Sequence, residues 1–229
     1  MSPAFNDILA PSILSANLAY LAQEIEDLIT AGAHWIHFDV MDNHYVPNLT
    51  FGPMLLKSLR DNNICAFIDV HIMAKPVDTL VDEFIVAGAN AITIHPATAN
   101  NPKATLNKIK SHNISAGLAI NPTEPLDKFF ALHAQINQLL IMTVEPGFSG
   151  QKFIDSTVAK IKQAAKFIYE NNLPIRLCVD GGVDLNNIAM LKQAGCNTFI
   201  AGSSIFNKKE KNSNPYAHII SQFKLNLRG

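Results

Sequence analysis

The feature that most constrains the fold is an alternation of short β-rich runs with amphipathic stretches of about 10–15 residues. The strand candidates are Ile8 to Leu14, His34 to Met41, Ala66 to Met73, Ala91 to His95, Ser115 to Ile120, Gln138 to Val144, Pro174 to Val179 and Thr198 to Ala201. A helical pattern follows each of them. Eight such units predict an α/β fold, a single (β/α)8 TIM barrel, with a doubly wound open sheet as the alternative.

Three similar triplets mark the junctions between a helix and the next strand. Ala31-Gly32-Ala33, Ala87-Gly88-Ala89 and Ala194-Gly195-Cys196 each place a glycine just past an apolar periodic segment, where helices commonly end. No Pro/Ser-rich linker, charge run or low-complexity tract interrupts the chain. We therefore predict one catalytic domain spanning residues 1–229.

The composition narrows the class of partner. A net charge of -1 with 16% charged residues favours neither disorder nor a broad nucleic-acid-binding surface, so we expect a small-molecule partner. No signal-peptide pattern and no apolar run of about 18 residues is found, which predicts a cytoplasmic protein with no membrane partner. The cysteines Cys65, Cys178 and Cys196 show no CxxC spacing, and we expect buried free thiols.

Polar residues gather near the predicted strand ends, where a barrel carries its chemistry. Alternation puts His37 and Asp39 on one face of the second strand, His71 on the equivalent face of the third, and Asp180 at the end of the seventh. A lone histidine in a β-run is more often a core or loop residue. Together these four form a His2Asp2 set that suits one divalent metal ion such as Zn, Fe, Mn or Co.

Spacing alone leaves the ligand set open. Five more residues lie in or beside strand ends: His34, Asp42, His44, Asp69 and His95. His34 opens its strand, at the end opposite the expected site. For Asp69, a polar residue paired inside the barrel and an orienter of a ligand histidine are equally good interpretations.

Glycine-rich turns follow the sixth, seventh and eighth strands. Their residues are Gly147, Phe148, Ser149, Gly150, Gly181, Gly182, Gly202 and Ser203. Barrels commonly bind phosphate in the loops after strands seven and eight, because free backbone N–H groups there favour an anion. A single glycine turn often serves only to reverse the chain, but three at successive strand ends predict a phosphate site.

Three methionines, Met41, Met73 and Met142, end the second and third strands and lie near the end of the sixth. Methionine in such positions usually fills a core. The functional alternative is that these apolar side chains cover the substrate and exclude water.

The chain resembles the ribulose-phosphate 3-epimerase family along nearly its whole length. The motifs that carry the resemblance are APSILSAN, HFDVMDNHYVPNLTFGP, DVHIM, TVEPGFSGQKF, VDGGV and AGSSIF. The resemblance implies interconversion of D-ribulose 5-phosphate and D-xylulose 5-phosphate, a step of the pentose phosphate pathway. It also implies metal binding by His37, Asp39, His71 and Asp180, proton transfer by Asp39 and Asp180, and substrate contact by Ser12 and His71. The glycine turns would hold the phosphate.

Epimerisation next to a ketone explains why two carboxylates are needed. One group removes the carbon-3 proton to give an enediolate, and a second returns a proton to the opposite face. Asn43 and Ser149 stand where the family usually has glycine, and a positive φ at Ser149 would strain the loop.

Alternative functions are an epimerase of a related ketose phosphate such as a hexulose 6-phosphate, a lyase or decarboxylase of a related family, and a noncatalytic sugar-phosphate-binding barrel. We expect a homo-oligomer.

Overall fold

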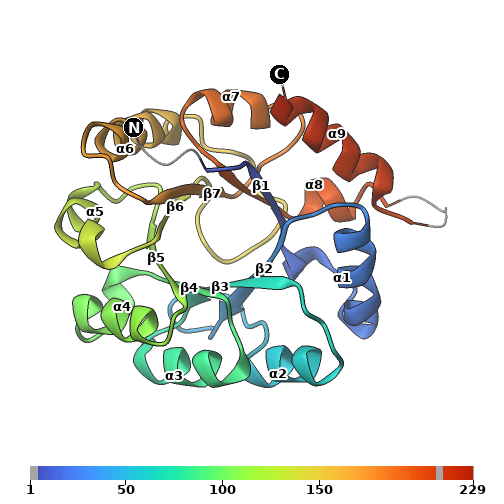
Figure 1. The fold of residues 1–229 in the computed structure, drawn as a ribbon, viewed down its shortest axis with the longest axis horizontal. Helices are drawn as coiled ribbons and strands as arrows, with labels where there is room; N and C mark the ends of the chain where they lie inside the picture. The colour runs from blue at the N-terminus through green and yellow to red at the C-terminus, as the bar shows by residue number, and fades with distance from the viewer. Residues whose placement is uncertain (1–4, 210–213, 229) are drawn as a thin grey trace.

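The computed structural model describes residues 5–209 and 214–228 and contains a ring of parallel strands (Figure 1). The strands are β1 (Ile8–Pro11), β2 (Trp35–Met41), β3 (Phe67–Met73), β4 (Ala91–Ile94), β5 (Ser115–Ile120), β6 (Gln138–Met142), β7 (Arg176–Asp180) and β8 (Thr198–Ala201). Their order in the sheet is β1-β8-β7-β6-β5-β4-β3-β2, and β1 lies beside β2. The predicted (β/α)8 barrel is confirmed.

Helices surround this ring (Figure 1). They are α1 (Leu21–Thr30), α2 (Pro53–Asp61), α3 (Asp78–Ala87), α4 (Pro102–Ser111), α5 (Asp127–Leu132), α6 (Thr157–Glu170), α7 (Ile188–Gln193), α8 (Ser203–Phe206) and α9 (Ala217–Arg228). Short 3-10 helices are η1 (Ile13–Ser15), η2 (Leu18–Tyr20), η3 (Pro96–Thr98) and η4 (His133–Gln135). The apolar stripes of the helices cover the outside of the sheet, and α9 packs against α1 and α7.

The seam between β1 and β2 closes the ring. The backbone N–H of His34 donates to the Leu9 carbonyl over 3.1 Å, and the Leu9 N–H donates to His34 Nδ1 over 3.1 Å. At the other end an isolated parallel bridge joins Ser12 to His37. His34 therefore belongs to the seam, away from the strand ends that carry the candidate site.

Most predicted strands agree with the structure to within one residue, but three bounds were wrong by two or more. The first strand ends at Pro11 rather than Leu14, the sixth at Met142 rather than Val144, and the seventh begins at Arg176 rather than Pro174. At the first strand the cause is local. The Ser12 hydroxyl accepts from the Leu14 N–H and starts η1, so the chain leaves the sheet early.

The three glycine triplets end helices as predicted. Gly32, Gly88 and Gly195 adopt φ values of 99°, 93° and 111°, which favour glycine because it lacks a Cβ. Asn43, one of the two departures from the family pattern, also has a positive φ, of 55°. Ser149 is not among the described non-glycine residues with positive φ, so the strain considered for it does not arise.

The interior of the barrel has a polar side and an apolar side. Between β2 and β3 the register pairs His37 with Asp69, Asp39 with His71, and Met41 with Met73. Elsewhere in the barrel a buried apolar cluster contains Ile8, Ala10, Ala119, Leu140, Met142, Cys178 and Ile200. Because side chains alternate along a strand, the two polar pairs form successive layers, and the methionine pair follows them at the carboxyl ends.

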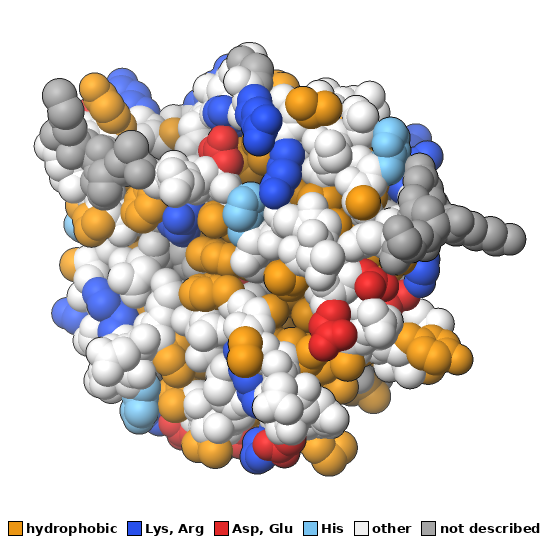
Figure 2. Space-filling model, turned by 45° about the vertical axis from the view of Figure 1, so that its right-hand side comes forward, with side chains coloured by type: hydrophobic (Ala, Val, Ile, Leu, Met, Phe, Trp, Pro, Cys, Tyr) orange, Lys and Arg blue, Asp and Glu red, His pale blue; other side chains and the backbone are white. Residues whose placement is uncertain are grey.

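The cysteine expectation was correct in part. Cys178 and Cys196 are buried free thiols, whereas Cys65 is free but exposed because it lies in the turn between α2 and β3. Among the described residues, no helix is both long and apolar enough to cross a membrane. The face drawn in Figure 2 carries basic and acidic side chains in small groups around a central gathering of hydrophobic ones.

Candidate metal centre and substrate cavity

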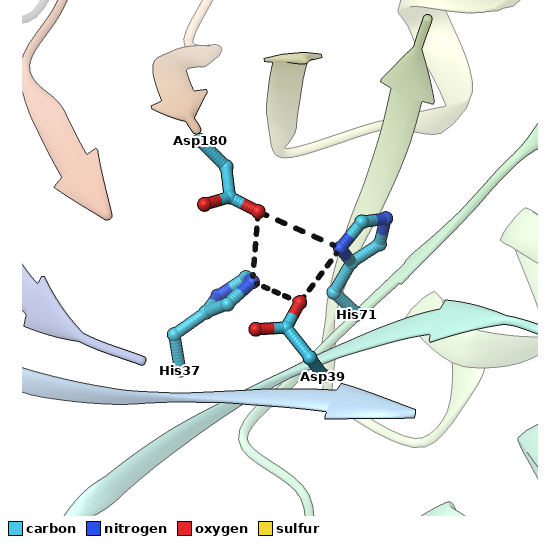
Figure 3. A group of neighbouring side chains, drawn as sticks. All are labelled: His37, Asp39, His71 and Asp180. Atoms are coloured by element: carbon cyan, nitrogen blue, oxygen red, sulfur yellow. Dashed lines mark hydrogen bonds and ion pairs between the residues drawn. The ribbon is translucent and has the colours of Figure 1, made fainter. Parts of the chain in front are cut away.

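Four side chains from three strands meet at the carboxyl end of the barrel, and we call them the metal cluster. They are His37 and Asp39 of β2, His71 of β3 and Asp180 of β7, and Figure 3 shows them pointing toward one another. One nitrogen or oxygen atom from each lies within 4.8 Å of the others. The structure thus brings together all four residues that were predicted as metal ligands.

The Asp39 distances are close to those around a tetrahedral ion, and the Asp180 distances are somewhat longer. Asp39 Oδ1 lies 3.3 Å from His37 Nε2 and 3.2 Å from His71 Nδ1, and Asp180 Oδ2 lies 3.8 Å and 4.0 Å from the same two nitrogens. Ligands about 2.0–2.2 Å from a tetrahedral ion are about 3.3–3.6 Å apart. His37 Nε2 is buried with no hydrogen-bond partner in the described chain, which is a costly arrangement unless a cation binds there.

The Asp39 carboxylate is held by a residue of the β1 end. Ser12 Oγ donates to Asp39 Oδ2 over 2.5 Å, and both side chains are buried. The other oxygen, Oδ1, is left to face the two histidines. Ser12 also lines the cavity described below, so substrate contact through its hydroxyl stays a prediction compatible with its position.

The ring of His37 is oriented by a carboxylate below it. Asp69 Oδ2 lies 2.9 Å from His37 Nδ1, and Asp69 Oδ1 accepts from Gln138 Nε2 over 2.7 Å. Gln138 Nε2 also donates to Thr93 Oγ1 over 2.8 Å. Since an ionised carboxylate only accepts, His37 carries a hydrogen on Nδ1, which leaves Nε2 as the atom that would face a metal. Burial acts to lower the pKa of His37, but Asp39 and Asp69 outweigh it and hold that pKa well above its ordinary value when no cation is present. Of the two interpretations of Asp69, the orienter is the one that this geometry supports.

Sequence reasoning did not single out Gln138 or Thr93. The signal was present in β5, where a Cβ on Gly117 would come within 2.1 Å of Thr93 Oγ1 and 2.9 Å of Gln138 Cγ. Glycine inside a strand often marks such a close approach. Gly117 therefore makes room for the polar layer beneath the metal cluster.

The second ligand histidine has a different partner. His71 Nε2 lies 2.9 Å from His95 Nε2, and both rings are fully buried. His95 directly follows β4, and its Nδ1 has no hydrogen-bond partner among the described residues. Burial and the neighbouring His71 hold the pKa of His95 well below its ordinary value, so it is neutral.

The two carboxyl groups of the cluster have pKa values pushed in opposite directions. Burial raises the pKa of Asp180, and the nearby Asp39 charge raises it further, to about 7. Burial also acts to raise the pKa of Asp39, but His37 and His71 outweigh it and hold that pKa far below its ordinary range. The cluster without a cation therefore contains one firmly ionised carboxylate and one that holds a proton near neutral pH.

A cavity of about 640 Å³ opens above the cluster. Its walls include Asp39 and Asp180 together with every other predicted substrate-binding residue except His71, which lies in the cluster beneath: Ser12, Met41, Met73, Met142, Gly147, Phe148, Ser149, Gly150, Gly181, Gly182, Gly202 and Ser203. This volume is within the range of small-molecule sites. The roles assigned to these residues stay predictions, but their positions bring them around one space.

Glycine turns line part of this cavity, and we call Gly147–Gly150, Gly181–Gly182 and Gly202–Ser203 the phosphate cradle. Gly147, Gly150, Gly181 and Gly182 have positive φ values of 136°, 79°, 114° and 64°. A Cβ on Gly182 would lie 2.6 Å from the Phe153 nitrogen, and one on Gly181 would lie 2.8 Å from the Val144 nitrogen. Both positions need glycine, because a side chain would clash with the backbone there. The glycines therefore allow one particular backbone conformation in these turns.

Ser149 ties the cradle to the β1 end. Its hydroxyl lies 2.6 Å from the hydroxyl of Ser15, and both groups lie beside Gly202, where an added Cβ would meet Ser15 Oγ at 2.9 Å and Ser149 Oγ at 3.5 Å. Ser15 was not predicted, nor was Lys208, an exposed cation that borders the same cavity. No glycine or strand-end pattern points to either residue.

The three predicted methionines are buried side chains that line the cavity wall. Met41, Met73 and Met142 are 4%, 1% and 2% exposed, yet all three line the cavity wall. Phe148, by contrast, is 54% exposed at the rim. Core filling and covering of the substrate are therefore compatible descriptions of the same methionine side chains.

Together these features define a (β/α)8 barrel with a His/Asp centre, able to hold a metal ion, beside a glycine-lined cavity. The family model described as "Ribulose-phosphate 3 epimerase family" matches residues 8–206. The chain belongs to this family of isomerases.

Named relatives cover most of the chain. The ribulose-phosphate 3-epimerase of Escherichia coli (strain K12) is 46% identical over 220 residues, which is 96% of each chain. That of Serratia marcescens is 47% identical over 203 residues, covering 89% of this chain and 97% of the relative. Among solved structures, phosphoribosyl anthranilate isomerase from Thermococcus kodakaraensis superposes with a TM-score of 0.64 at 15% identity, covering 97% and 99% of the two chains, and so shares the fold.

Proposed function

We propose that this protein interconverts D-ribulose 5-phosphate and D-xylulose 5-phosphate by epimerisation at carbon 3, with Asp39 and Asp180 as the acid and base. The observation that carries the proposal is the pair of carboxyl groups, Asp39 and Asp180, that line the cavity and face one another across the metal cluster. Family membership and the names of the relatives support the choice of substrate.

The proton transfers use the two carboxyl groups in turn. With a ketose phosphate between them, the ionised Asp39 takes the proton from carbon 3, and the electron pair of that C–H bond moves into the enediolate. Protonated Asp180 then delivers a proton to the opposite face of carbon 3, which inverts its configuration. In the reverse reaction Asp180 is the base and Asp39 the acid.

The metal cluster fits one divalent cation, held by His37, Asp39, His71 and Asp180. Two imidazoles and two carboxylates suit Zn, Fe, Mn or Co. When bound, such a cation supplies a positive charge that polarises the ketone and stabilises the negative charge of the enediolate. Asp69 and Ser12 keep the ligand atoms aimed at the cluster.

The phosphate cradle would fix which carbon lies between the carboxyl groups. Backbone N–H groups in such glycine turns can favour an anion, and Lys208 borders the same cavity with a positive charge. Buried Met41, Met73 and Met142 exclude water that would compete for the protons.

Two measurements test the proposal. Protein purified without added metal is analysed for bound metal, and turnover of D-ribulose 5-phosphate is measured before and after chelation. We expect one equivalent of a divalent metal after reconstitution, and loss of epimerisation on chelation. Full activity in rigorously metal-free protein would contradict the metal part of the proposal.

A panel of ketose phosphates separates the alternatives. We expect D-ribulose 5-phosphate to be epimerised with the highest kcat/KM. A preference for a hexulose 6-phosphate would assign the site to a related epimerase or lyase. Binding of sugar phosphates without any turnover would favour a noncatalytic barrel.

Three broader predictions accompany the activity: residues 1–229 form one catalytic domain, the protein is cytoplasmic, and it forms a homo-oligomer. An apolar groove between α2 and α3 supports self-association, because Met54 and Val86 are 85% and 82% exposed there. Light scattering after size-exclusion chromatography would reveal the assembly. A monomer at micromolar concentration would contradict it.

A further inference from the structure

The two ligand histidines of the metal cluster have partners of different chemistry. His37 Nδ1 faces the Asp69 carboxylate, which accepts hydrogen bonds and never donates when ionised. His71 Nε2 instead faces His95 Nε2 at 2.9 Å, and a neutral imidazole nitrogen can either donate or accept. At this distance one of the two nitrogens carries a hydrogen and the other a lone pair. Either histidine can therefore be the donor in this hydrogen bond, so its direction can differ between the metal-free and metal-bound states.

Without a cation, Asp39 sets the direction. Asp39 Oδ1 lies 3.2 Å from His71 Nδ1, and a carboxylate accepts hydrogen bonds, so His71 donates through Nδ1–H. A neutral ring with its hydrogen on Nδ1 has a lone pair on Nε2. His95 must then donate through its Nε2–H, which leaves its own Nδ1 as a lone pair.

With a cation in the cluster, the direction must change. The atom of His71 that faces the cluster is Nδ1, so coordination requires a lone pair there. The ring then carries its hydrogen on Nε2, which donates to His95 Nε2. His95 consequently carries its hydrogen on Nδ1.

We propose that His95 is a positioning residue whose hydrogen bond with His71 reverses when a divalent cation binds, so that His95 stabilises the metal-binding tautomer of His71. The inference rests on the metal site of the proposed function. His37 needs no reversal, because the Asp69 carboxylate accepts from a hydrogen on Nδ1 of His37 in both states. The tautomer of the buried His95 ring therefore depends on whether a cation is bound in the metal cluster, although His95 itself does not contact the ion.

Nitrogen-15 NMR of histidine-labelled protein reads this reversal directly. Long-range proton-nitrogen spectra are recorded without metal and with one equivalent of Zn²⁺, and His95 is assigned with the variants below. We expect His95 to carry its hydrogen on Nε2 without metal and on Nδ1 with zinc, while the Nδ1 of His37, which faces Asp69, carries a hydrogen in both states. The same His95 tautomer in both states would overturn the proposal.

Metal affinity gives a second readout that does not depend on activity. Zinc dissociation constants are measured by competition with a chromophoric chelator for the wild type, His95→Phe, His95→Gln and the control His133→Gln, which changes a histidine that bonds the Phe130 carbonyl. Loss of an outer partner of a ligand typically weakens binding about 10- to 100-fold, so we expect this for His95→Phe, a smaller loss for His95→Gln and none for the control.

The outcomes separate the inference from the proposed function. If His95→Phe binds zinc as tightly as the wild type and its melting temperature is unchanged, the positioning role is wrong while the metal site stands. If the wild type itself binds no divalent metal, the metal site of the proposed function fails, and the reversal fails with it. If His95→Phe does not fold, the NMR measurement of the wild-type tautomers and the zinc dissociation constant of His95→Gln still test the proposal.

Discussion

The metal cluster and the phosphate cradle border one cavity but are built in opposite ways. The cluster consists of side chains on strands, and three of its four members are buried with orienting partners. The cradle consists largely of backbone in loops, and its shape depends on glycines with positive φ. Substitutions in the cluster should therefore act through chemistry, and those in the cradle through conformation.

The largest effect is expected from the acid-base pair. Asp39→Asn and Asp180→Asn each remove a proton-transferring group but keep the size of the side chain, so kcat should fall by about 10²- to 10⁴-fold. A coupled epimerase assay measures this loss. Asp61→Asn, an exposed change on α2, is the control and should leave kcat unchanged. Near-normal turnover in either site variant would remove that residue from the mechanism.

The next effect concerns the orientation of a ligand. Asp69→Asn places an amide beside His37 Nδ1 and no longer fixes the tautomer of that ring, so metal affinity should fall about 10- to 100-fold. Chelator competition measures the change, with turnover at saturating metal as a second reading. Unaltered affinity would mean that Asp69 only fills the barrel, which was the other interpretation of this residue.

Conformation should dominate in the cradle. Gly182→Ala puts a Cβ about 2.6 Å from a backbone nitrogen at a φ of 64°, and such strain costs about 1–3 kcal/mol. Inhibition by inorganic phosphate should weaken about tenfold, since 1.4 kcal/mol corresponds to a factor of ten. Gly52→Ala is the matched control, because nothing lies within 4 Å of its added Cβ. Equal phosphate affinity in both variants would contradict a conformational role for Gly182.

The smallest effect is expected at the link between Ser149 and Ser15. Their exposed hydroxyl pair is worth no more than about 1 kcal/mol, so Ser149→Ala should weaken phosphate binding by less than about fivefold. Ser15→Ala should do the same, and the double variant should add little more. Two fully additive losses in the same phosphate titration would show that the hydroxyls act separately.

The same contrast explains what the sequence could predict. The barrel followed from eight alternating units, and the four cluster residues followed from alternation along β2 and β3 together with the family motifs. Alternation shows which side chains share a face, but it does not show which strands from opposite sides of the barrel reach one another. Gln138 and Thr93 were missed for this reason, although Gly117 carried a signal of the close approach.

Other features depended on local hydrogen bonds that no periodic pattern records. The Ser12 hydroxyl ended β1 early, and the pairing of Ser149 with Ser15 joins segments far apart in the chain. His95 was noticed only as one of several polar residues near strand ends. Its meaning depends on a 2.9 Å contact between two buried rings, which only coordinates provide.

Exchange of the carbon-3 hydrogen with solvent tests the central claim most directly. Metal-loaded protein is incubated with D-ribulose 5-phosphate in deuterium oxide, and the carbon-3 position of both epimers is followed by NMR. We predict that D-xylulose 5-phosphate forms with deuterium at carbon 3, and that Asp39→Asn and Asp180→Asn each suppress its formation. Product that retains the original hydrogen, or deuterium incorporation undiminished in both variants, would contradict proton transfer by this pair.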